Sequence, residues 1–335
     1  MNIQHVVSLK PFNTFGIDVN AKRYVSVKNV GELQEVLQLK EDVFVLSGGS
    51  NLLLTKDINK LVIHLNTKGI EVQELNSNEV LVSVQAGENW HEFVLWCISK
   101  NYGGLENLSL IPGNVGTCPI QNIGAYGVEV KDTITGVEAV EIKTGILKNF
   151  SNYECDFGYR NSVFKNELKG KYILTTVTFK LTRNEHTLHN SYGAIQAELE
   201  STKITQPNIK NISDAVINIR NSKLPNPKEI GNSGSFFKNP VISSKNFARL
   251  KKIHPTMPSY VISEKEIKIP AAWLIEQCGF KGKRFGETGS HKNQALVLVN
   301  YGNATGKEVH KLAIKIQATV LRNFEITLEI EVNVL

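Results

Sequence analysis

The sequence contains no apolar run close to the roughly 18 residues that a membrane-spanning helix requires. Its first five residues carry neither the basic head nor the apolar stretch of a secretion signal. No cysteine stands in a C-x-x-C pair or at a zinc-ligand spacing from a histidine. We therefore expect a cytoplasmic protein with no bound metal and with reduced thiols, at Cys97, Cys118, Cys155 and Cys278.

A concentrated basic surface is also missing. The 38 basic and 32 acidic residues leave a net charge of +6, but the densest basic patch is only Lys281–Arg284. A nucleic-acid-binding protein would gather this charge in a stripe, so we expect no nucleic-acid partner. A mild, dispersed excess suits a solvated surface or a site for a small anionic ligand. The length of 335 residues predicts two or three domains.

Strand-like and helix-like segments alternate along the chain, which predicts a mixed α and β protein. Apolar residues recur at every second position of Val80–Ala86 and at helical spacing in Lys307–Phe324. The end of the chain, Phe324–Val334, also alternates and predicts a strand with Glu329 and Glu331 on its polar face. Arg183–Asn211 is polar and weakly patterned, as in an insertion. Further predicted strands are Arg23–Val27, Val43–Leu46, Lys60–Leu65, Gly136–Lys143, Tyr172–Leu181 and Ala295–Val299, and further helices are Val30–Leu39, Trp90–Ile98, Ala215–Arg220 and one starting at Pro270.

Several familiar nucleotide and nucleophile motifs do not occur. No G-x-G-x-x-G follows a predicted strand, which removes support for a Rossmann dinucleotide site. Gly302–Lys307 is one residue short of a phosphate-binding P-loop and lacks the following Ser or Thr. Gly231–Ser235 lacks the second glycine of a nucleophile elbow. These segments predict turns rather than those sites.

Two glycine-rich segments are unusual. In Ser47–Leu52, paired glycines after a strand let backbone N–H groups approach an anion, although a simple tight turn explains them equally well. The longer segment, Ile111–Gly127, has four glycines, two prolines and few charges, which does not suit a flexible linker. An ordered apolar loop with polar side chains, such as Gln121 and Asn122, suits a large flat ligand with polar edges.

Taken with several other motifs, these two segments resemble the flavin-binding part of the UDP-N-acetylenolpyruvoylglucosamine reductase family, which acts in bacterial cell-wall synthesis. The resemblance extends over nearly the whole chain, from about residue 11 to residue 332. Ser191–Gly193 is similar to the tyrosine loop of the longer subtype of this family. The other matching segments are Asn13–Gly16, Gly158–Lys165, Lys223–Pro227, Gly231–Pro240, Trp273–Cys278, His291–Val299 and Leu328–Val332.

The resemblance implies an α+β fold with a two-lobed FAD-binding domain of the PCMH/vanillyl-alcohol-oxidase type and a C-terminal α/β substrate-binding domain. Its expected parts are lobe 1 at 1–66, lobe 2 at 67–222, and a substrate-binding domain at 223–324, with the terminal strand 325–335 joining lobe 2. It further implies noncovalent FAD, NADPH as hydride donor, and reduction of UDP-N-acetylglucosamine enolpyruvate to UDP-N-acetylmuramate. A monomer with a UDP-sugar substrate, serving peptidoglycan synthesis, cell shape and cell division, is expected.

The resemblance also assigns residues. Ser235 is expected to donate the proton to the enolic carbon, while Arg160 and Glu331 stabilise the enolate; periodicity alone does not choose between Glu329 and Glu331. Substrate contacts are expected from Tyr159, Tyr192, Lys223, Asn239 and Gln294. Cofactor contacts are expected from Ser47, Gly48, Gly49, Ser50, Asn51, Leu52, Ile111, Pro112, Gly113, Thr117, Ile120, Gln121, Asn122, Gly124, Ala125, Tyr126, Gly127 and Arg220.

The end of the chain departs from the family pattern, because Ile330 stands where a proline is usual and Asn333 where an arginine often follows. Two rival interpretations stay open at this stage. A flavin oxidase of the same superfamily often attaches its flavin through His or Cys, and the matched loops offer only Cys118 for that purpose. A flavin-free binding protein could also have kept the fold.

Overall fold

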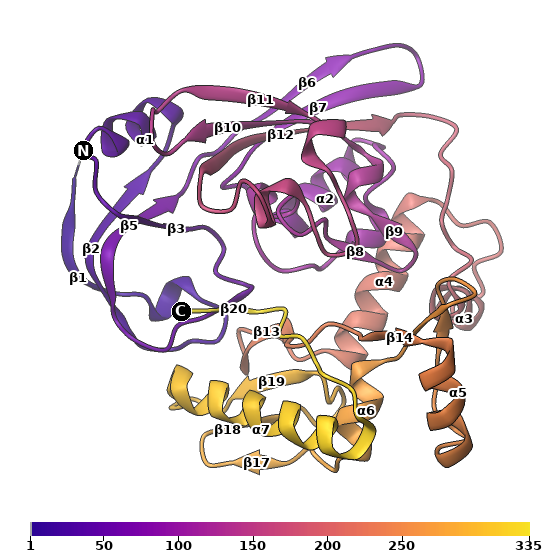
Figure 1. Ribbon diagram of the computed structural model, residues 1–335. Helices are drawn as coiled ribbons and strands as arrows, with labels where there is room; N and C mark the ends of the chain where they lie inside the picture. The colour runs from indigo at the N-terminus through magenta and orange to yellow at the C-terminus, as the bar shows by residue number, and fades with distance from the viewer. Residues whose placement is uncertain (1) are drawn as a thin grey trace. The chain divides into compact units, whose positions relative to one another are not determined.

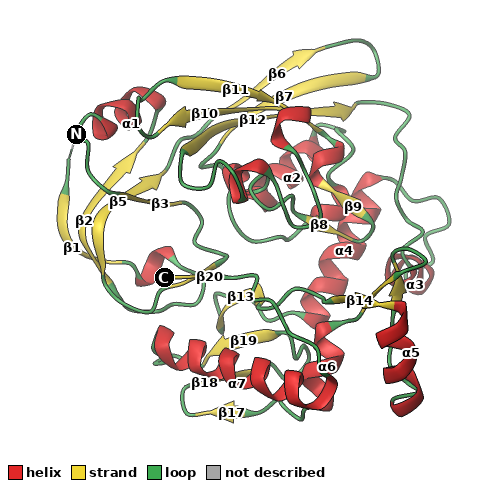
Figure 2. Ribbon diagram, viewed as in Figure 1, coloured by secondary structure: helices red, strands yellow, loops and turns green. Residues whose placement is uncertain are grey.

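The computed structural model describes residues 2–335 and divides the chain into two compact units, each assembled from separate stretches of sequence. Unit 1 comprises the described residues up to Val7, then Ala21–Gly48 and Ile58–Ser222. Unit 2 comprises Ser8–Asn20, Gly49–Asp57 and Lys223–Leu335. Both units combine helices with sheets, as the colours of Figure 2 show, so the α+β prediction is confirmed.

The first part of unit 1 is a four-stranded sheet in the order β1-β2-β5-β3, which Figure 1 shows beside α1. β2 and β3 both run parallel to β5, where Ile63 lies opposite Val25 on one side and Val45 on the other. α1 begins at Asn29, whose side-chain oxygen accepts the N–H of Glu32 at 2.9 Å. The elements are β1 (Gln4–Ser8), β2 (Asn20–Val27), α1 (Val30–Leu37), β3 (Val43–Leu46) and β5 (Ile58–Leu65).

The second part of unit 1 is a five-stranded antiparallel sheet in the order β11-β10-β12-β7-β6. Its buried face packs against α2, where the rings of Trp90 and Phe93 lie 6.0 Å and 5.2 Å from the ring of Phe179. The alternation predicted for Val80–Ala86 therefore forms one wall of a core. The elements are β6 (Ile70–Glu74), β7 (Glu79–Gln85), α2 (Trp90–Ser99), β8 (Gly124–Ala125), β9 (Val128–Glu129), β10 (Ile134–Glu141), β11 (Leu147–Ser151) and β12 (Tyr172–Thr182).

Two further helices complete unit 1. α3 (Gly193–Ser201) and α4 (Ile209–Lys223, of which Lys223 falls in unit 2) pack together through a small apolar cluster. The polar stretch predicted as an insertion therefore contains a helix of its own, held by Ile195 and Leu199. Tyr126, from the long glycine-rich segment, packs against the same cluster.

Unit 2 builds three small sheets, in the orders β13-β19-β18-β17, β14-β16-β15 and β20-β4, together with three helices. The longest, α7, starts with a reciprocal cap between Thr305 and Glu308. Gly306 follows at once, and a Cβ there would lie 1.8 Å from the carbonyl oxygen of Leu54, so only glycine fits. The elements are β4 (Leu52–Leu53), β13 (Gly231–Ser235), β14 (Val241–Ser243), α5 (Ser244–Ile253), β15 (Tyr260–Val261), β16 (Glu266–Lys268), α6 (Ala271–Gln277), β17 (Arg284–Phe285), β18 (Thr288–Ser290), β19 (Val297–Asn300), α7 (Gly306–Phe324) and β20 (Asn333–Val334).

The terminal segment differs from its prediction. Alternate residues from 324 to 328, and again 332, are buried as expected, but regular strand forms only at β20, which runs parallel to β4. Before that, Ile330 makes a single antiparallel bridge with Phe237. The helix α7 ends at Phe324, and the next residue, Glu325, takes a left-handed conformation (φ 58°). This conformation changes the direction of the chain at the start of the terminal segment. The segment lies in unit 2, where its last strand pairs with β4.

Candidate functional site

The two glycine-rich segments meet in unit 1. A Cβ built on Gly48 would lie 2.9 Å from the Cα of Gly113 and 3.0 Å from Oδ1 of Asn114, so the backbones approach as only glycine allows. Next to Gly48, the hydroxyl of Ser47 is buried and has no hydrogen-bond partner within the described part of the chain. A buried hydroxyl without a partner is costly unless a ligand satisfies it. These features fit a bound flavin nucleotide.

The long segment is fixed by its own hydrogen bonds. Asn122 is fully buried at φ 43°, and its Nδ2 donates to Oε2 of Glu129 at 3.1 Å and to the carbonyl of Gly158 at 3.0 Å. Its Oδ1 accepts the N–H of Lys131 at 3.1 Å. Both N–H groups of the amide are therefore engaged within the protein, and Asn122 shapes the loop from inside.

A partly buried cation lies beside this segment. Nε of Arg220, on α4, donates to the carbonyl of Leu110 at 3.2 Å, and its guanidinium also bonds the hydroxyl of Tyr126. Loss of solvent lowers the pKa of Arg220 and raises the pKa of Tyr126. The ring of Tyr126 meets that of Tyr192 edge to face at 5.5 Å. The structure thus brings together Arg220 and Tyr126, both predicted cofactor residues, and Tyr192, a predicted substrate residue.

Arg160 is anchored to the same loop. Its Nη2 donates to the carbonyl of Gly124 at 2.8 Å, and its guanidinium carbon lies 5.8 Å from the ring centre of Tyr159. The residue takes a left-handed backbone conformation (φ 53°), which is uncommon outside glycine. Arg160 and Tyr159 are thus placed on a short strained turn beside the predicted cofactor residues Gly124 and Ala125.

In unit 2, the structure brings Ser235 and Glu331 close along paired backbones. The N–H of Glu331 donates to the carbonyl of Phe236 at 2.9 Å, one residue beyond Ser235. Nδ2 of Asn51 approaches the carbonyl of Glu331 at 3.4 Å. Ser235 is exposed at the end of β13, so its hydroxyl is accessible.

The structure also distinguishes the two terminal glutamates. Glu329 is exposed and forms an ion pair with Lys238, whereas Glu331 is partly buried. The bridge at Ile330 uses the N–H groups of Lys238 and Glu331 and not that of Ile330, so it tolerates the proline expected at this position in relatives. Asn333 donates from Nδ2 to the carbonyl of Asn51 at 3.0 Å.

The other predicted substrate residues of unit 2 have varied surroundings. Lys223 is exposed at the end of α4. Oδ1 of Asn239 accepts the N–H of Ala271 at 2.9 Å and thereby caps α6. Gln294 turns back on its own segment, accepting the N–H of Leu296 at 3.4 Å. Near Ser235 in the sequence, the side chain of Lys238 bonds Glu329, and that of Asn239 bonds the N–H of Ala271.

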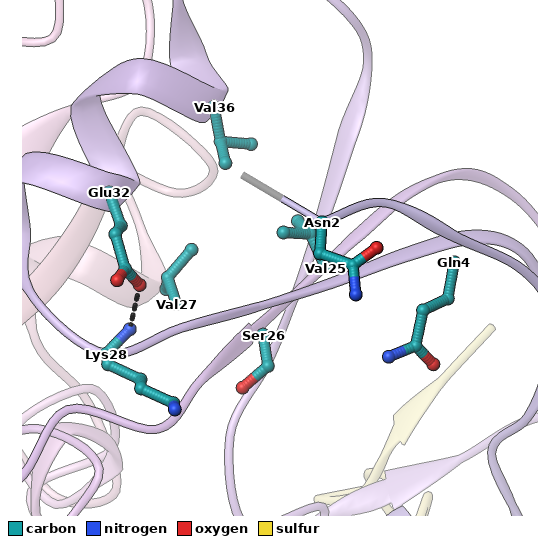
Figure 3. Close-up of a pocket in the computed structure, with 8 residues that line it drawn as sticks. All are labelled: Asn2, Gln4, Val25, Ser26, Val27, Lys28, Glu32 and Val36. Carbon is teal, nitrogen blue, oxygen red and sulfur yellow. Dashed lines mark hydrogen bonds between the residues drawn. The ribbon is translucent and has the colours of Figure 1, made fainter.

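A pocket of about 320 Å³ lies beside β2 and α1, and Figure 3 shows its lining. In it, the backbone N–H of Lys28 donates to the carboxylate of Glu32 at 2.7 Å. None of the predicted site residues lines this pocket, so it is separate from the glycine-rich segments. Its lining residues are Asn2, Gln4, Val25, Ser26, Val27, Lys28, Glu32 and Val36.

Two general features bear on the sequence predictions. All four cysteines are free, and Cys97, Cys118 and Cys155 are buried. Within residues 2–335, no helix combines the length and the apolar character needed to cross a bilayer.

Some residues that shape the site were not predicted. Asn114 lies against Gly48, and Nδ1 of His91 accepts the N–H of Leu110 at 3.0 Å. Ser213 bonds Ser109 at 2.8 Å, just before the long glycine-rich segment. Asn114 was inside that segment and could have been included, but His91 and Ser213 lie on helices where nothing local marks them.

Comparison with known proteins defines the class first. An FAD-binding domain model matches residues 21–151, and a UDP-N-acetylenolpyruvoylglucosamine reductase C-terminal domain model matches residues 226–335. The chain is therefore an FAD-dependent oxidoreductase, and the predicted combination of an FAD-binding domain with a second domain is confirmed.

Full-length relatives then define the family. Proteins named UDP-N-acetylenolpyruvoylglucosamine reductase from Flavobacterium johnsoniae and Amoebophilus asiaticus are 56% and 49% identical, each match covering 100% of both chains. The crystal structure of such a reductase from Thermus caldophilus superimposes with a TM-score of 0.71 at 25% identity, covering 100% of this chain and 99% of the other. The chain belongs to the UDP-N-acetylenolpyruvoylglucosamine reductase family, as its motifs predicted.

Proposed function

We propose that this chain reduces the enolpyruvyl group of UDP-N-acetylglucosamine enolpyruvate with NADPH, giving UDP-N-acetylmuramate for peptidoglycan synthesis in the cytoplasm. The observation that carries the proposal is full-length similarity to reductases of this name, together with the pairing that brings Ser235 next to Glu331. A role in cell shape and division follows from the product. We further propose that the enzyme acts as a monomer.

The flavin is proposed to bind noncovalently along the two glycine-rich segments. Bound FAD supplies hydride transfer, from NADPH to the methylene carbon of the substrate. Glycine at position 48 lets the two segments pack against each other, and the unpartnered hydroxyl of Ser47 can give a diphosphate a hydrogen bond. Cys118 is fully buried and burial raises the pKa of its thiol, which argues against a covalent link at that residue.

Three residues are proposed to serve the chemical step. Ser235, exposed at the end of β13, donates the proton to the enolic carbon. Arg160 counters the negative charge that builds next to the substrate carboxylate, and Glu331 serves the same end as a protonated carboxyl group that donates a hydrogen bond, or through a bridging water. Arg160 suits this role because a guanidinium binds a carboxylate through two parallel hydrogen bonds.

The remaining substrate contacts are proposed at the negatively charged diphosphate and at the nucleotide of the substrate. We propose that Lys223 and Tyr192 hold the diphosphate and nucleotide, and that Tyr159, Asn239 and Gln294 complete the substrate site. Lys223 and Tyr192 are both exposed and can reach a ligand. The proposed functional regions are lobe 1 at 1–66, lobe 2 at 67–222 and the substrate-binding region at 223–324.

One spectroscopic experiment tests the proposal. The purified protein is expected to absorb near ~450 nm, to bleach on anaerobic addition of NADPH, and to regain its colour when the enolpyruvyl substrate is added. Bleaching that only oxygen reverses would favour the rival flavin oxidase, and absence of the flavin band would favour a binding protein. Acid precipitation distinguishes the form of attachment, because noncovalent flavin stays in the supernatant.

A further inference from the structure

Leu110 occupies an unusual backbone position directly before the flavin-binding segment. Its φ is 58°, in the left-handed region that a branched side chain seldom adopts. Ile111, Pro112 and Gly113 follow at once, and Gly113 is the residue that lies against Gly48. The conformation of Leu110 therefore sets the direction in which this part of the loop leaves the core. A strained residue of this kind persists only where its surroundings hold it.

Two side chains hold the peptide groups of Leu110 from different helices. Nδ1 of His91, in the first turn of α2, accepts its N–H at 3.0 Å. Nε of Arg220, on α4, donates to its carbonyl at 3.2 Å. Because Nδ1 accepts this bond, it carries no proton, and the neutral imidazole bears its hydrogen on Nε2.

The start of α2 also fixes both sides of this residue. The backbone N–H of Trp90 donates to the carbonyl of Gly113 at 3.0 Å, and its indole N–H donates to the carbonyl of Leu108 at 2.9 Å. Consecutive residues of one helix thus hold Leu108, Leu110 and Gly113. Trp90 holds Leu108 and Gly113 through its buried indole and its backbone N–H, neither of which changes charge with pH. His91 holds Leu110 through its imidazole, which can take up a proton.

We propose that neutral His91 is a positioning residue for flavin binding, which holds Leu110 so that the Ile111–Gly113 backbone stays open to the cofactor beside Gly48. This inference rests on the proposed placement of the flavin along the glycine-rich segments. His91 acts through the backbone of Leu110 and does not itself need to touch the flavin.

The charges around His91 give the role a pH dependence. The positive charge of Arg220, on α4, disfavours protonation of His91. The negative charge of Glu92, which lies on α2 beside His91, favours protonation less strongly. Partial burial and Arg220 lower the pKa of His91. The neutral form therefore persists to lower pH than in an ordinary histidine and is lost as the pH falls through the lowered pKa.

The test measures the dissociation constant of FAD, from the fluorescence of released flavin, for the holoenzyme between pH 8 and pH 5. His91→Phe keeps ring volume without an acceptor and is expected to weaken FAD binding about tenfold to a hundredfold at pH 8. His91→Asn places an amide oxygen near the position of Nδ1 and should bind within about threefold of wild type. Wild type should release flavin as a histidine titrates, whereas the two His91 variants should not. His5→Asn, an exposed histidine of unit 1, is the control and should leave the wild-type profile unchanged.

A second variant separates loop geometry from general damage. Glycine adopts φ 58° without steric cost, so adding Leu110→Gly to His91→Phe should recover a large part of the lost affinity. If His91→Phe binds FAD like wild type at every pH while Gly48→Ala loses it, the role of His91 is wrong and the flavin placement stands. If neither change alters FAD binding, the flavin placement is wrong and this inference falls with it.

Discussion

Ser235 and Glu331 lie at neighbouring positions of two paired backbones, joined through the hydrogen bond from the N–H of Glu331 to the carbonyl of Phe236. Almost 100 residues of sequence separate them, and the end of α7 turns the chain so that they meet. The proposed proton donor and the proposed enolate-stabilising residue thus lie on two neighbouring backbones of unit 2. Their roles can be separated by half-reaction.

Ser235→Ala is expected to leave NADPH-dependent bleaching of the flavin at the wild-type rate. Reoxidation by the enolpyruvyl substrate should fall by about 10²- to 10⁴-fold, because the proton donor is gone. Anaerobic stopped-flow absorption measures both steps. Ser201→Ala, which changes a serine at the end of α3, serves as control and should alter neither. Normal turnover of Ser235→Ala would show that Ser235 is not the proton donor.

Glu331→Gln should likewise spare bleaching by NADPH and slow transfer to the substrate, by about ten- to a thousandfold, because an amide has no acidic proton to share with the developing enolate. Glu329→Gln is a closely matched control, two residues away, exposed and paired with Lys238. If both variants slow transfer equally, the effect belongs to the terminal segment as a whole. Slow bleaching in Glu331→Gln would place the residue in the other half-reaction.

Gly48→Ala is expected to yield protein with little bound FAD, because the new Cβ would lie 2.9 Å from the Cα of Gly113. The ratio of flavin absorption to protein absorption measures occupancy. Gly136→Ala adds the same methyl group on β10, where the nearest atom is 3.6 Å away, and should keep full occupancy. Full occupancy in both variants would contradict the proposed placement of the flavin beside Gly48.

The cysteines should react only when the protein opens. Burial raises the pKa of Cys155 to about 12 and the pKa of Cys97 and Cys118 well above the usual range, so these thiols stay neutral at pH 8. A colorimetric thiol reagent should therefore label at most Cys278 in the native protein and four thiols after denaturation. Rapid labelling of more than one thiol in the native protein at pH 8 would contradict this.

The same thiols predict loss of stability in alkali. Because their folded pKa values are raised, the stability they contribute is present below the ordinary cysteine pKa near 8.5 and is lost as the pH rises above it. The midpoint of urea unfolding should therefore move to lower urea between pH 8 and pH 10. Valine in place of Cys97, a small apolar replacement in the same core, should reduce that shift.

Local patterns predicted the elements that make one buried face. β7 and α7 could be recognised because their apolar periods match a strand and a helix, and the structure buries Val82 and Ile316 as those periods require. The alternation of the terminal segment predicted correctly which of its residues are buried. It also predicted one long strand, but regular strand forms only at β20, because a strand needs a partner edge elsewhere in the chain. Only Phe237 and β4 supply such an edge.

The composition of the glycine-rich segments pointed to a ligand, but their meeting at Gly48 and Gly113 is a long-range contact that no local pattern specifies. The role of His91 is hidden for a similar reason. It depends on Leu110 adopting a conformation that its side chain disfavours, so local preference argues against the arrangement that the fold imposes.

Unit 2 takes two short pieces from the beginning of the chain and the rest from its end. The side chain of Asn300 donates a hydrogen bond to the carbonyl of Phe15, and Gly306 lies against Leu54. The two early pieces of unit 2 therefore pack against residues from the end of the chain. On the ribosome, residues 8–20 and 49–57 must wait until residues 223–335 have emerged before this unit can close. Such long loops slow the search for native contacts, and the newly made chain would depend on chaperones longer than a contiguous domain of equal size.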